Sequence, residues 1–451
     1  MISFDEYLKK FNKLAQKYIP PRSEWTPPDD AVYGVKDIFR VPEKEAKELR
    51  LKAIKFQFKR HYEKNSFYRR LCKERKISPD DIKREEDFKK IPLIPDKFFK
   101  NYPSGRDFAI WLSNIITGDI PEIEIPNKNP SYDEVVESFN SAGMAVAYSS
   151  GTSGRFTFIP RDERTFKIAQ YAAAKSIVIN VYPLWDHNIY GYLLMPNPFK
   201  TNVFAGKICG IYFDLIKDVE VAIDKRISTK TVSRAMSGGR LRRYLLRHAI
   251  GVLGKRVVKN IIKWLDLHSR EKDSKMALVG APALMHSVLI KLKEEGKNFD
   301  LFNRVGIITG GGWKVQEDKR IPVSDFRRLA EEVLGINPMH CLDVYGMVEG
   351  NGFMVHCPEG HYLHVPYTFF YPMVLDENLE PKGFGEQGRF AFLDGTTFSY
   401  PGFIITGDSV KLLEKCPACD RPGPVLEPEV KRMGGEEVRG CAEEVRRMLS
   451  I

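Results

Sequence analysis

The sequence lacks the features that mark several large classes of protein. No window approaches the run of about 18 apolar residues that a membrane-spanning helix requires. The first ten residues, MISFDEYLKK, carry an acidic pair where a secretory signal would have a basic cap and an apolar run. Seven cysteines in 451 residues are too few, and odd in number, for a disulfide framework. We therefore expect a soluble protein of a reducing cytoplasm.

Several motifs are missing as well. The phosphate-binding pattern GxxxxGK[ST] and the hydrolase pattern GxSxG do not occur, and there is no internal repeat or low-complexity segment. What the chain does have is 43% apolar and 12% aromatic residues, which is enough for a sizeable core. Charged residues make up 29% and are mixed in sign, which excludes global disorder.

Positive charge is concentrated in one region. The chain has a net charge of +11. Residues 225–263 alone contain twelve Lys and Arg and no Asp or Glu, so the rest of the chain is nearly neutral. Apolar residues recur among these charges and predict an amphipathic helical hairpin broken near Gly251–Gly254. A membrane surface, a nucleotide tail or an acidic protein face would suit this region, and a solvated basic face is the simpler alternative. We expect no nucleic-acid partner, because no binding motif is present.

Apolar periodicity predicts the fold class. Residues 1–100 read mainly as helices, and from about residue 140 short apolar strands alternate with helices. Strands are expected at 189–195, 276–280, 305–309 and 341–345, and helices at 43–72, 161–178, 282–295 and 317–334. Beyond residue 385 the pattern favours a smaller β-rich subregion. The alternation indicates an α/β protein with largely buried sheets.

Four loops have the composition of ligand-binding loops. They are YSSGTSG at 148–154, GGGWK at 310–314, DVYGMVEG at 343–350 and TGD at 406–408. Glycines let a backbone approach a phosphate or a flat ring, and hydroxyls add donors. A carboxylate in the third loop could bind Mg²⁺, and Asp408 could accept both hydroxyls of a ribose. Taken singly, each loop could equally be a turn or a helix cap.

In order and spacing, the four loops resemble those of the adenylate-forming superfamily of acyl- and aryl-CoA ligases, luciferases and peptide-synthetase adenylation domains. The resemblance covers roughly residues 90–441 and implies ATP as substrate with Mg²⁺. It assigns the pyrophosphate end of ATP to Ser149, Ser150, Gly151, Thr152, Ser153 and Gly154, the adenine to Gly310, Gly311, Gly312, Tyr345 and Gly346, Mg²⁺ to Glu349, and the ribose to Asp408. Tyr345 would stack on the adenine.

Two positions depart from that family pattern. The lysine usual shortly after the phosphate loop is missing, and Arg155 and Arg161 are the candidate substitutes. Val348 stands where relatives usually carry threonine, so one hydroxyl contact to the nucleotide is lost.

The C-terminal region indicates which family within this superfamily the chain resembles. Only sixteen residues follow the hinge-like segment Lys431–Gly435, so we expect the superfamily's mobile C-terminal domain to be absent. This length, the SSGTSG and GGGWK loops and Cys441 are similar to the acyl-protein synthetase of the bacterial bioluminescent fatty-acid reductase complex. That resemblance implies a fatty-acid substrate, Cys441 as acyl acceptor, and a reductase partner. Cys441, Arg432 and Glu349 are then the expected catalytic residues.

We divide the chain accordingly. The expected units are a helical N-terminal segment at 1–100, an α/β adenylation core at 101–385, a β-rich subregion at 386–430, and a hinge remnant with a short tail at 431–451.

Cysteines and histidines near residues 357–419 predict a structural zinc site. Cys357 precedes two histidines, and Cys416 and Cys419 form a C-x₂-C pair, which is ligand spacing typical of zinc. The fourth ligand could be His361 or His364, and similarity to phenylacetate-CoA-ligase-like relatives favours His364. The remaining Cys72, Cys209 and Cys341 read as buried small residues.

Two rival functions stay open at this point. The chain could be an acyl- or aryl-CoA ligase whose small domain is a separate polypeptide, which predicts CoA-dependent release of a thioester. It could also be a non-catalytic nucleotide-binding scaffold, which predicts no pyrophosphate exchange with any carboxylate.

Overall fold

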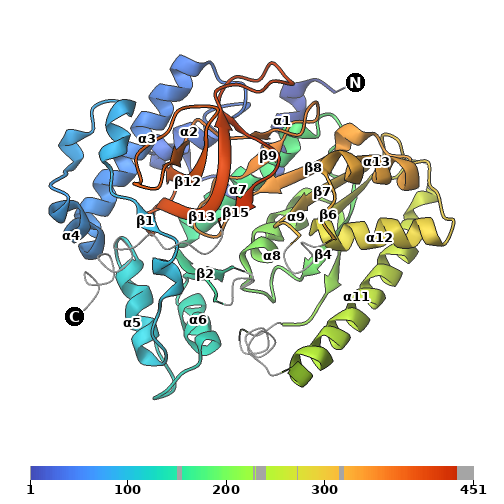
Figure 1. Ribbon diagram of the computed structural model, residues 1–451, viewed down its shortest axis with the longest axis horizontal. Helices are drawn as coiled ribbons and strands as arrows, with labels where there is room; N and C mark the ends of the chain where they lie inside the picture. Colours follow the sequence, from blue (N-terminus) through green and yellow to red (C-terminus); the bar gives the residue numbers. More distant parts are fainter. Residues whose placement is uncertain are drawn as a thin grey trace.

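The computed structural model describes residues 2–149, 155–226, 229, 240–271, 273–313 and 319–433, with the backbone alone for residues 240–253 (Figure 1). Helices are α1 (Phe4–Leu14), α2 (Pro27–Tyr33), α3 (Glu43–Lys64), α4 (Ser66–Glu74), α5 (Arg106–Ile115), α6 (Tyr132–Ser141), α7 (Glu163–Asn180), α8 (Phe204–Ile208), α9 (Tyr212–Leu215), α11 (Arg240–Ser269), α12 (Pro282–Glu294) and α13 (Val323–Leu334). Strands are β1 (Ile94–Pro95), β2 (Ala145–Tyr148), β3 (Phe158–Arg161), β4 (Tyr190–Pro196), β5 (Asp218–Ile223), β6 (Met276–Gly280), β7 (Val305–Gly310), β8 (Cys341–Tyr345), β9 (Met354–His356), β10 (Leu363–His364), β11 (Phe370–Leu375), β12 (Gln387–Asp394), β13 (Phe403–Leu413), β14 (Val425–Leu426) and β15 (Lys431–Arg432).

A mixed sheet of 13 strands organises the chain. One half is parallel, in the order β5-β4-β6-β7-β8, and continues through antiparallel β9, β10 and β14 to β13, β12 and β11. The connections of the parallel half run through helices, as parallel pairing requires. A separate antiparallel hairpin, β2–β3, pairs Tyr148 with Phe158.

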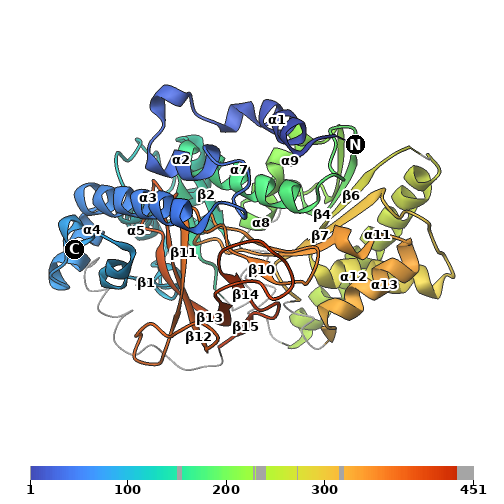
Figure 2. The ribbon, with the colours of Figure 1, turned by 90° about the horizontal axis from the view of Figure 1, so that it is seen from above.

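Alternating side chains divide the core between the two faces of the parallel half. Tyr192 and Leu194 of β4 pack in a cluster with α11, α12 and α13, whereas Leu193 packs in the larger cluster on the other side. Figure 2 shows α7 and α8 on the opposite side of the sheet from α11, α12 and α13. Because both faces are covered, nearly every residue of these strands is apolar, as the sequence pattern indicated.

Local signals account for most element boundaries. The expected strands at 276–280 and 341–345 coincide with β6 and β8. The helix expected from residue 161 begins at Glu163, because Asp162 caps it by accepting from the Thr165 amide. The pattern at 43–72 is two helices, since Asn65 ends α3 and its side chain caps α4. Pro322 delays α13 to Val323, because proline offers no amide hydrogen to an earlier turn.

The expected break at Gly251–Gly254 is wrong, because α11 runs unbroken from Arg240 to Ser269. Glycine within a helix costs only about 1 kcal/mol each. The burial of Ile261 and Leu265 against the sheet, among other side chains, outweighs this cost. Figure 1 shows the first residues of α11 extending away from the body of the protein. Among the described residues, no helix has both the length and the apolarity needed to cross a bilayer.

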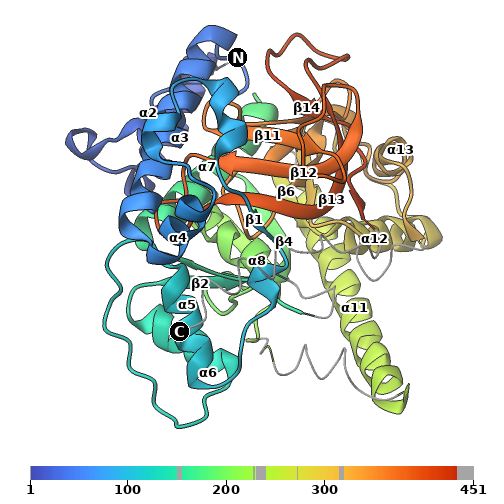
Figure 3. The same ribbon diagram turned by 60° about the vertical axis from the view of Figure 1, so that its left-hand side comes forward.

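Strand β13 collects segments from distant parts of the chain. Strand β1 pairs parallel to it at Ile94↔Ile404, and β15 pairs antiparallel at Asp408↔Arg432. Figure 3 shows β1 beside β13, next to β12 and β11. The TGD loop residues of the sequence therefore lie within β13, flanked by an early segment and a late one.

Candidate nucleotide site and cysteine cluster

Asp408 lies at the centre of a polar group that joins three of the predicted site residues. The Tyr345 hydroxyl donates to Asp408 Oδ2 at 2.7 Å, and Arg432 Nε lies 3.1 Å from Asp408 Oδ1. Burial, and then the charge of Asp408, raises the pKa of Tyr345 well above its ordinary value, so its hydroxyl stays a donor. Both carboxylate oxygens are thus engaged, and a ribose at Asp408 would exchange with these contacts.

Glu349 is a buried carboxylate at the end of the loop that follows β8. Burial raises its pKa, the negative charge of Asp96 raises it further, and Lys100 acts in the opposite direction. Carboxylate oxygens are hard ligands that Mg²⁺ prefers, and a cation would offset the repulsion between Glu349 and Asp96. The residues present therefore fit a magnesium ion, with Glu349 as the ligand expected from the sequence.

Arg161 anchors the loop that carries Glu349 by hydrogen bonds. This fully buried guanidinium donates to Val348 O at 2.6 Å, to Gly350 O at 3.2 Å and to Asn351 Oδ1 at 3.2 Å. It also lies over the rings of Phe204 and Tyr400. The expectation that Arg161 substitutes for a phosphate-binding lysine is wrong, because its guanidinium is used inside the protein.

We expect Arg161→Met to lower the free energy of unfolding by about 3 kcal/mol, because it leaves buried carbonyl groups without donors. Urea denaturation of purified protein measures this. Arg328→Met is the matched control, since Arg328 is 76% exposed in a surface pair with Asp325, and should change stability by no more than about 0.5 kcal/mol. Equal effects of the two substitutions would contradict the anchoring role.

The glycines predicted to border the adenine occupy positions where a residue with a side chain would be strained or crowded. Gly311 and Gly312 have φ of +82° and +68°, in the left-handed region. A Cβ at Gly346 would lie 2.6 Å from the Phe353 ring. At Gly310 a Cβ would be 3.2 Å from Val344 O. Side chains are therefore excluded at the carboxyl ends of β7 and β8, which is where ligands enter open α/β sheets.

The phosphate-loop prediction is only partly covered by the described residues. Ser149 begins the loop, donates its amide to Thr157 O at 3.0 Å and accepts from the Thr157 amide at Oγ, also at 3.0 Å. Strands β2 and β3 flank the loop, which the sequence pattern did not predict. Ser150, Gly151, Thr152, Ser153, Gly154, Lys314, Arg439 and Cys441 lie outside the described residues.

Three cysteines and one histidine meet beyond the carboxyl end of β13. The ligand atoms of Cys357, His364, Cys416 and Cys419 all lie within 4.8 Å of one another. Cys357 Sγ is 3.9 Å from Cys416 Sγ, and Cys419 Sγ is 3.3 Å from His364 Nε2. Of the two candidate histidines, His364 belongs to this group and His361 does not; His364 lies on β10, which pairs with β9 and β14.

These distances fit a tetrahedral metal site. Zinc bonds of about 2.3 Å to sulfur and 2.0 Å to nitrogen place sulfur atoms about 3.8 Å apart and a sulfur about 3.5 Å from the nitrogen. The side-chain contact with Cys357, and also that with His364, lowers the pKa of Cys419, which favours the thiolate that a metal needs.

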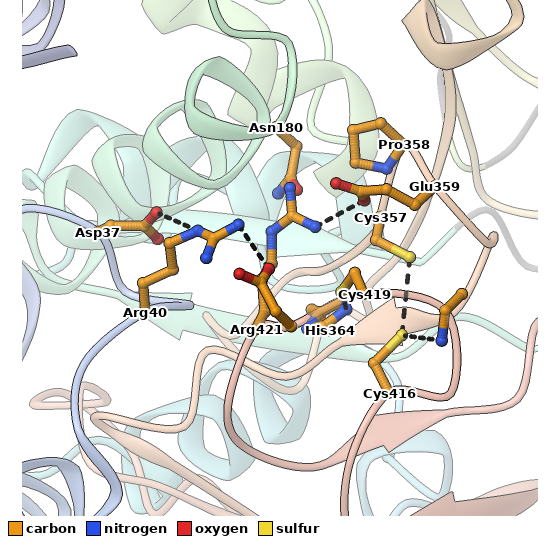
Figure 4. A network of polar contacts seen from close by, with 12 residues as sticks. Asp37, Arg40, Asn180, Cys357, Pro358, Glu359, His364, Cys416, Cys419 and Arg421 are labelled. Atoms are coloured by element: carbon orange, nitrogen blue, oxygen red, sulfur yellow. Dashed lines mark hydrogen bonds and ion pairs between the residues drawn. The ribbon is translucent and has the colours of Figure 1, made fainter.

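Two ion pairs flank the cluster (Figure 4). Arg421 Nη1 lies 2.6 Å from Glu359 Oε2 and joins the two ligand-bearing segments, and Arg40 Nη2 lies 2.9 Å from Asp420 Oδ1 and links the cluster to the N-terminal region. The remaining described cysteines, Cys72, Cys209 and Cys341, are buried apart from the cluster, as expected.

Comparison with known proteins finds one family and two curated proteins that are similar to this chain. The family model described as "Acyl-protein synthetase, LuxE" matches residues 255–450. The chain is 24% identical over 405 residues to a long-chain-fatty-acid–luciferin-component ligase of Vibrio harveyi, covering 88% of the chain and 87% of the relative. It is 26% identical over 407 residues to the ligase of the same name from Aliivibrio fischeri, covering 88% of each.

A solved structure supports the fold. 2-Hydroxyisobutyryl-CoA ligase, in an open conformation with 2-HIB-AMP and CoA, superposes with a TM-score of 0.57 at 15% identity, over 92% of this chain and 76% of the ligase. The chain is thus similar in sequence to the LuxE acyl-protein synthetases and has the α/β fold of the adenylate-forming ligases, as the sequence resemblance indicated.

Proposed function

We propose that the chain activates a long-chain fatty acid with ATP and Mg²⁺ and then transfers the acyl group to its own Cys441. The observation that carries this proposal is the meeting of Tyr345, Asp408 and Arg432 within contact distance, with the buried Glu349 following β8 on the same loop as Tyr345. The names of the two bacterial relatives supply the fatty-acid substrate.

The proposed chemistry has two balanced steps. A carboxylate oxygen of the fatty acid attacks the α-phosphorus of ATP, forming a new P–O bond while the bond to the β-phosphate breaks and pyrophosphate leaves. The Cys441 thiolate then attacks the acyl carbon, forming a thioester, and AMP leaves with the bonding electron pair. An intramolecular thiol gains from a high effective concentration.

Each site residue has a defined part in this proposal. Asp408 accepts the ribose hydroxyls, Arg432 moves from Asp408 toward the nucleotide, and Gly311 and Gly312 leave space for the base. A magnesium ion held by Glu349 would neutralise phosphate charge. The acyl thioester is then delivered to a reductase partner, in the cytoplasm, where thiols remain reduced.

The cysteine cluster completes the proposal as a structural zinc site. Four protein ligands fill a tetrahedral zinc and leave no open position for substrate. The metal would join the β9–β10 turn to the segment that follows β13, and so fix the strand that carries Asp408.

Intact-protein mass spectrometry tests the acylation. We expect wild-type protein incubated with Mg·ATP and a panel of fatty acids, without CoA, to gain one acyl mass that hydroxylamine removes. Cys441→Ala should show no gain, whereas Cys72→Ala, which changes a buried cysteine outside the site, should gain the same mass.

The other outcomes separate the rival functions. No gain in the wild type, together with AMP release only when CoA is added, would replace self-acylation by CoA ligase activity. Absence of both, with no pyrophosphate exchange, would leave a nucleotide-binding scaffold.

A further inference from the structure

A lysine and an aspartate that no sequence motif marks lie at the candidate nucleotide site. Lys100 Nζ is 2.5 Å from Asp96 Oδ2, and the two side chains are 20% and 12% exposed. Both act electrostatically on the buried carboxylate of Glu349, Asp96 raising its pKa and Lys100 lowering it. The pair therefore lies beside the residue expected to hold Mg²⁺.

The backbone brings this pair to the site by a short strand. Strand β1 pairs with β13 at Ile94↔Ile404 and Pro95↔Ile405, and the Asp96 amide donates to Ile405 O at 2.8 Å. A Cβ built on Gly407 would lie 3.5 Å from Asp96 Oδ2, so Asp96 adjoins the residue before Asp408. The short 3-10 helix η5 (Phe98–Lys100) then places Lys100 one turn further on.

Lys100 also contacts the residue that follows the phosphate loop in sequence. Its carbonyl oxygen accepts from Arg155 Nη1 at 3.3 Å. Lys100 therefore contacts Asp96, which adjoins the strand of Asp408, and also Arg155, and its charge acts on Glu349. In a bound nucleotide the α-phosphate lies between the ribose, which is assigned to Asp408, and the β- and γ-phosphates, which are assigned to the magnesium ion at Glu349.

Two other described cations near the site have different partners and different roles. Arg161 is buried beneath the loop of Glu349, and Arg432 pairs with Asp408. An ammonium group is a compact charge with three donors, of which Asp96 Oδ2 takes one. We propose that Lys100 contacts the α-phosphate of the nucleotide and stabilises the charge that develops there, with Asp96 as its positioning residue. This inference rests on the proposed function and adds a catalytic residue to it.

The proposal specifies what Lys100 does in the adenylation step. Negative charge accumulates on the α-phosphoryl oxygens while the carboxylate attacks and pyrophosphate leaves, and a fixed cation lowers the barrier by stabilising it. The same contact persists in the acyl-adenylate and in AMP, because both keep the α-phosphate. Adenosine lacks it, which separates this role from general support of the site.

The test compares the equilibrium binding of AMP and of adenosine by calorimetry. We expect wild-type protein to bind AMP about 10- to 100-fold more tightly than adenosine, and Lys100→Met to lose that difference while binding adenosine unchanged. Lys97→Met is the matched control, since Lys97 is exposed on the same segment, and should keep the difference. Asp408→Asn should weaken both ligands alike, and Lys100→Arg should retain part of the AMP preference.

A Lys100→Met protein that still prefers AMP would overturn the proposal, as would wild-type protein that binds both ligands equally or neither. Loss of adenosine binding in Lys100→Met would show a structural role instead and equally overturn it. Pyrophosphate exchange in Lys100→Met should fall about 100-fold or more, because the variant lacks the cation that stabilises the charge on the α-phosphoryl oxygens. If wild-type protein exchanges no pyrophosphate with any carboxylate, the proposed function fails while the comparison of AMP with adenosine still decides the binding role of Lys100.

Discussion

Replacing Glu349 with glutamine is expected to stabilise the protein and to inactivate it. Burial raises the pKa of Glu349 above its ordinary 4.5, so the folded state favours the neutral carboxyl group. At neutral pH the wild type folds at the cost of burying that charge or binding a proton, whereas glutamine is neutral throughout. Glu349→Gln should therefore raise the melting temperature by a few degrees. Each unit by which folding raises the pKa of Glu349 costs the wild type about 1 kcal/mol of folding free energy at neutral pH.

The pH dependence gives the sign of this effect. Below pH 4.5 both folded and unfolded wild type carry a protonated Glu349, and the two proteins should melt alike. As the pH rises from that value through the raised pKa of the folded state, wild type loses stability relative to the variant, and the gap then stays constant. Calorimetric melting between pH 4 and pH 8 measures the gap.

Activity should change in the opposite direction. Loss of the magnesium ligand should reduce pyrophosphate exchange by about 100-fold or more. Glu377→Gln is the matched control, because Glu377 is exposed in a surface turn, and should leave both melting and exchange unchanged. A lower melting temperature in Glu349→Gln would contradict the raised pKa of the buried carboxyl group, and undiminished exchange would contradict the metal-binding role.

Loss of the metal ligands is expected to have the larger effect on stability. Purified protein should contain one zinc ion per chain by elemental analysis. Cys416→Ser and His364→Asn should lower the zinc content to near zero and the melting temperature by about 10 °C, because folding then loses the free energy of metal binding. The two substitutions change ligands from different segments, so a common effect identifies the shared site.

His361→Asn is the matched control for His364→Asn. His361 lies in the same turn with φ of +68°, a conformation that asparagine tolerates better than most residues. It should keep the zinc ion and nearly the wild-type melting temperature. Zinc retained by His364→Asn but lost by His361→Asn would reverse the ligand assignment, and a zinc-free wild type with the same stability would remove the metal site altogether.

Sequence reasoning succeeded where local signals specify the structure. Strands β6 and β8 are runs of apolar residues whose bounds the pattern gave to the residue. The C-x₂-C pair and His364 were named as ligands and do come together. The strands depend on residues that are neighbours in sequence, and the ligand set depends on a spacing that is typical of zinc sites.

Sequence reasoning failed where contacts between residues distant in sequence determine the position of a side chain. Strand β1 has two residues, too few for a period, and only its partner on β13 gives Asp96 and Lys100 their place. Their separation by four residues could have suggested an ion pair, but not one beside Glu349. The sequence pattern assigned Arg161 to a helix and to a phosphate site, whereas its place on β3 directs it into the core. The break at Gly251–Gly254 was wrong because tertiary packing outweighed helix propensity.

The pairing of β1 and β15 with β13 also determines the order in which parts of the protein can fold during synthesis. Residues Ile94 and Ile404 pair although about 310 residues separate them, which corresponds to on the order of 15 to 60 s of synthesis on the ribosome. The parallel half of the sheet is complete once β8 has emerged, but Asp96 and Lys100 must wait for β13, and Asp408 for β15. A nascent chain thus acquires its scaffold early and its nucleotide site last, so truncated translation products would be folded in part and unable to hold ATP.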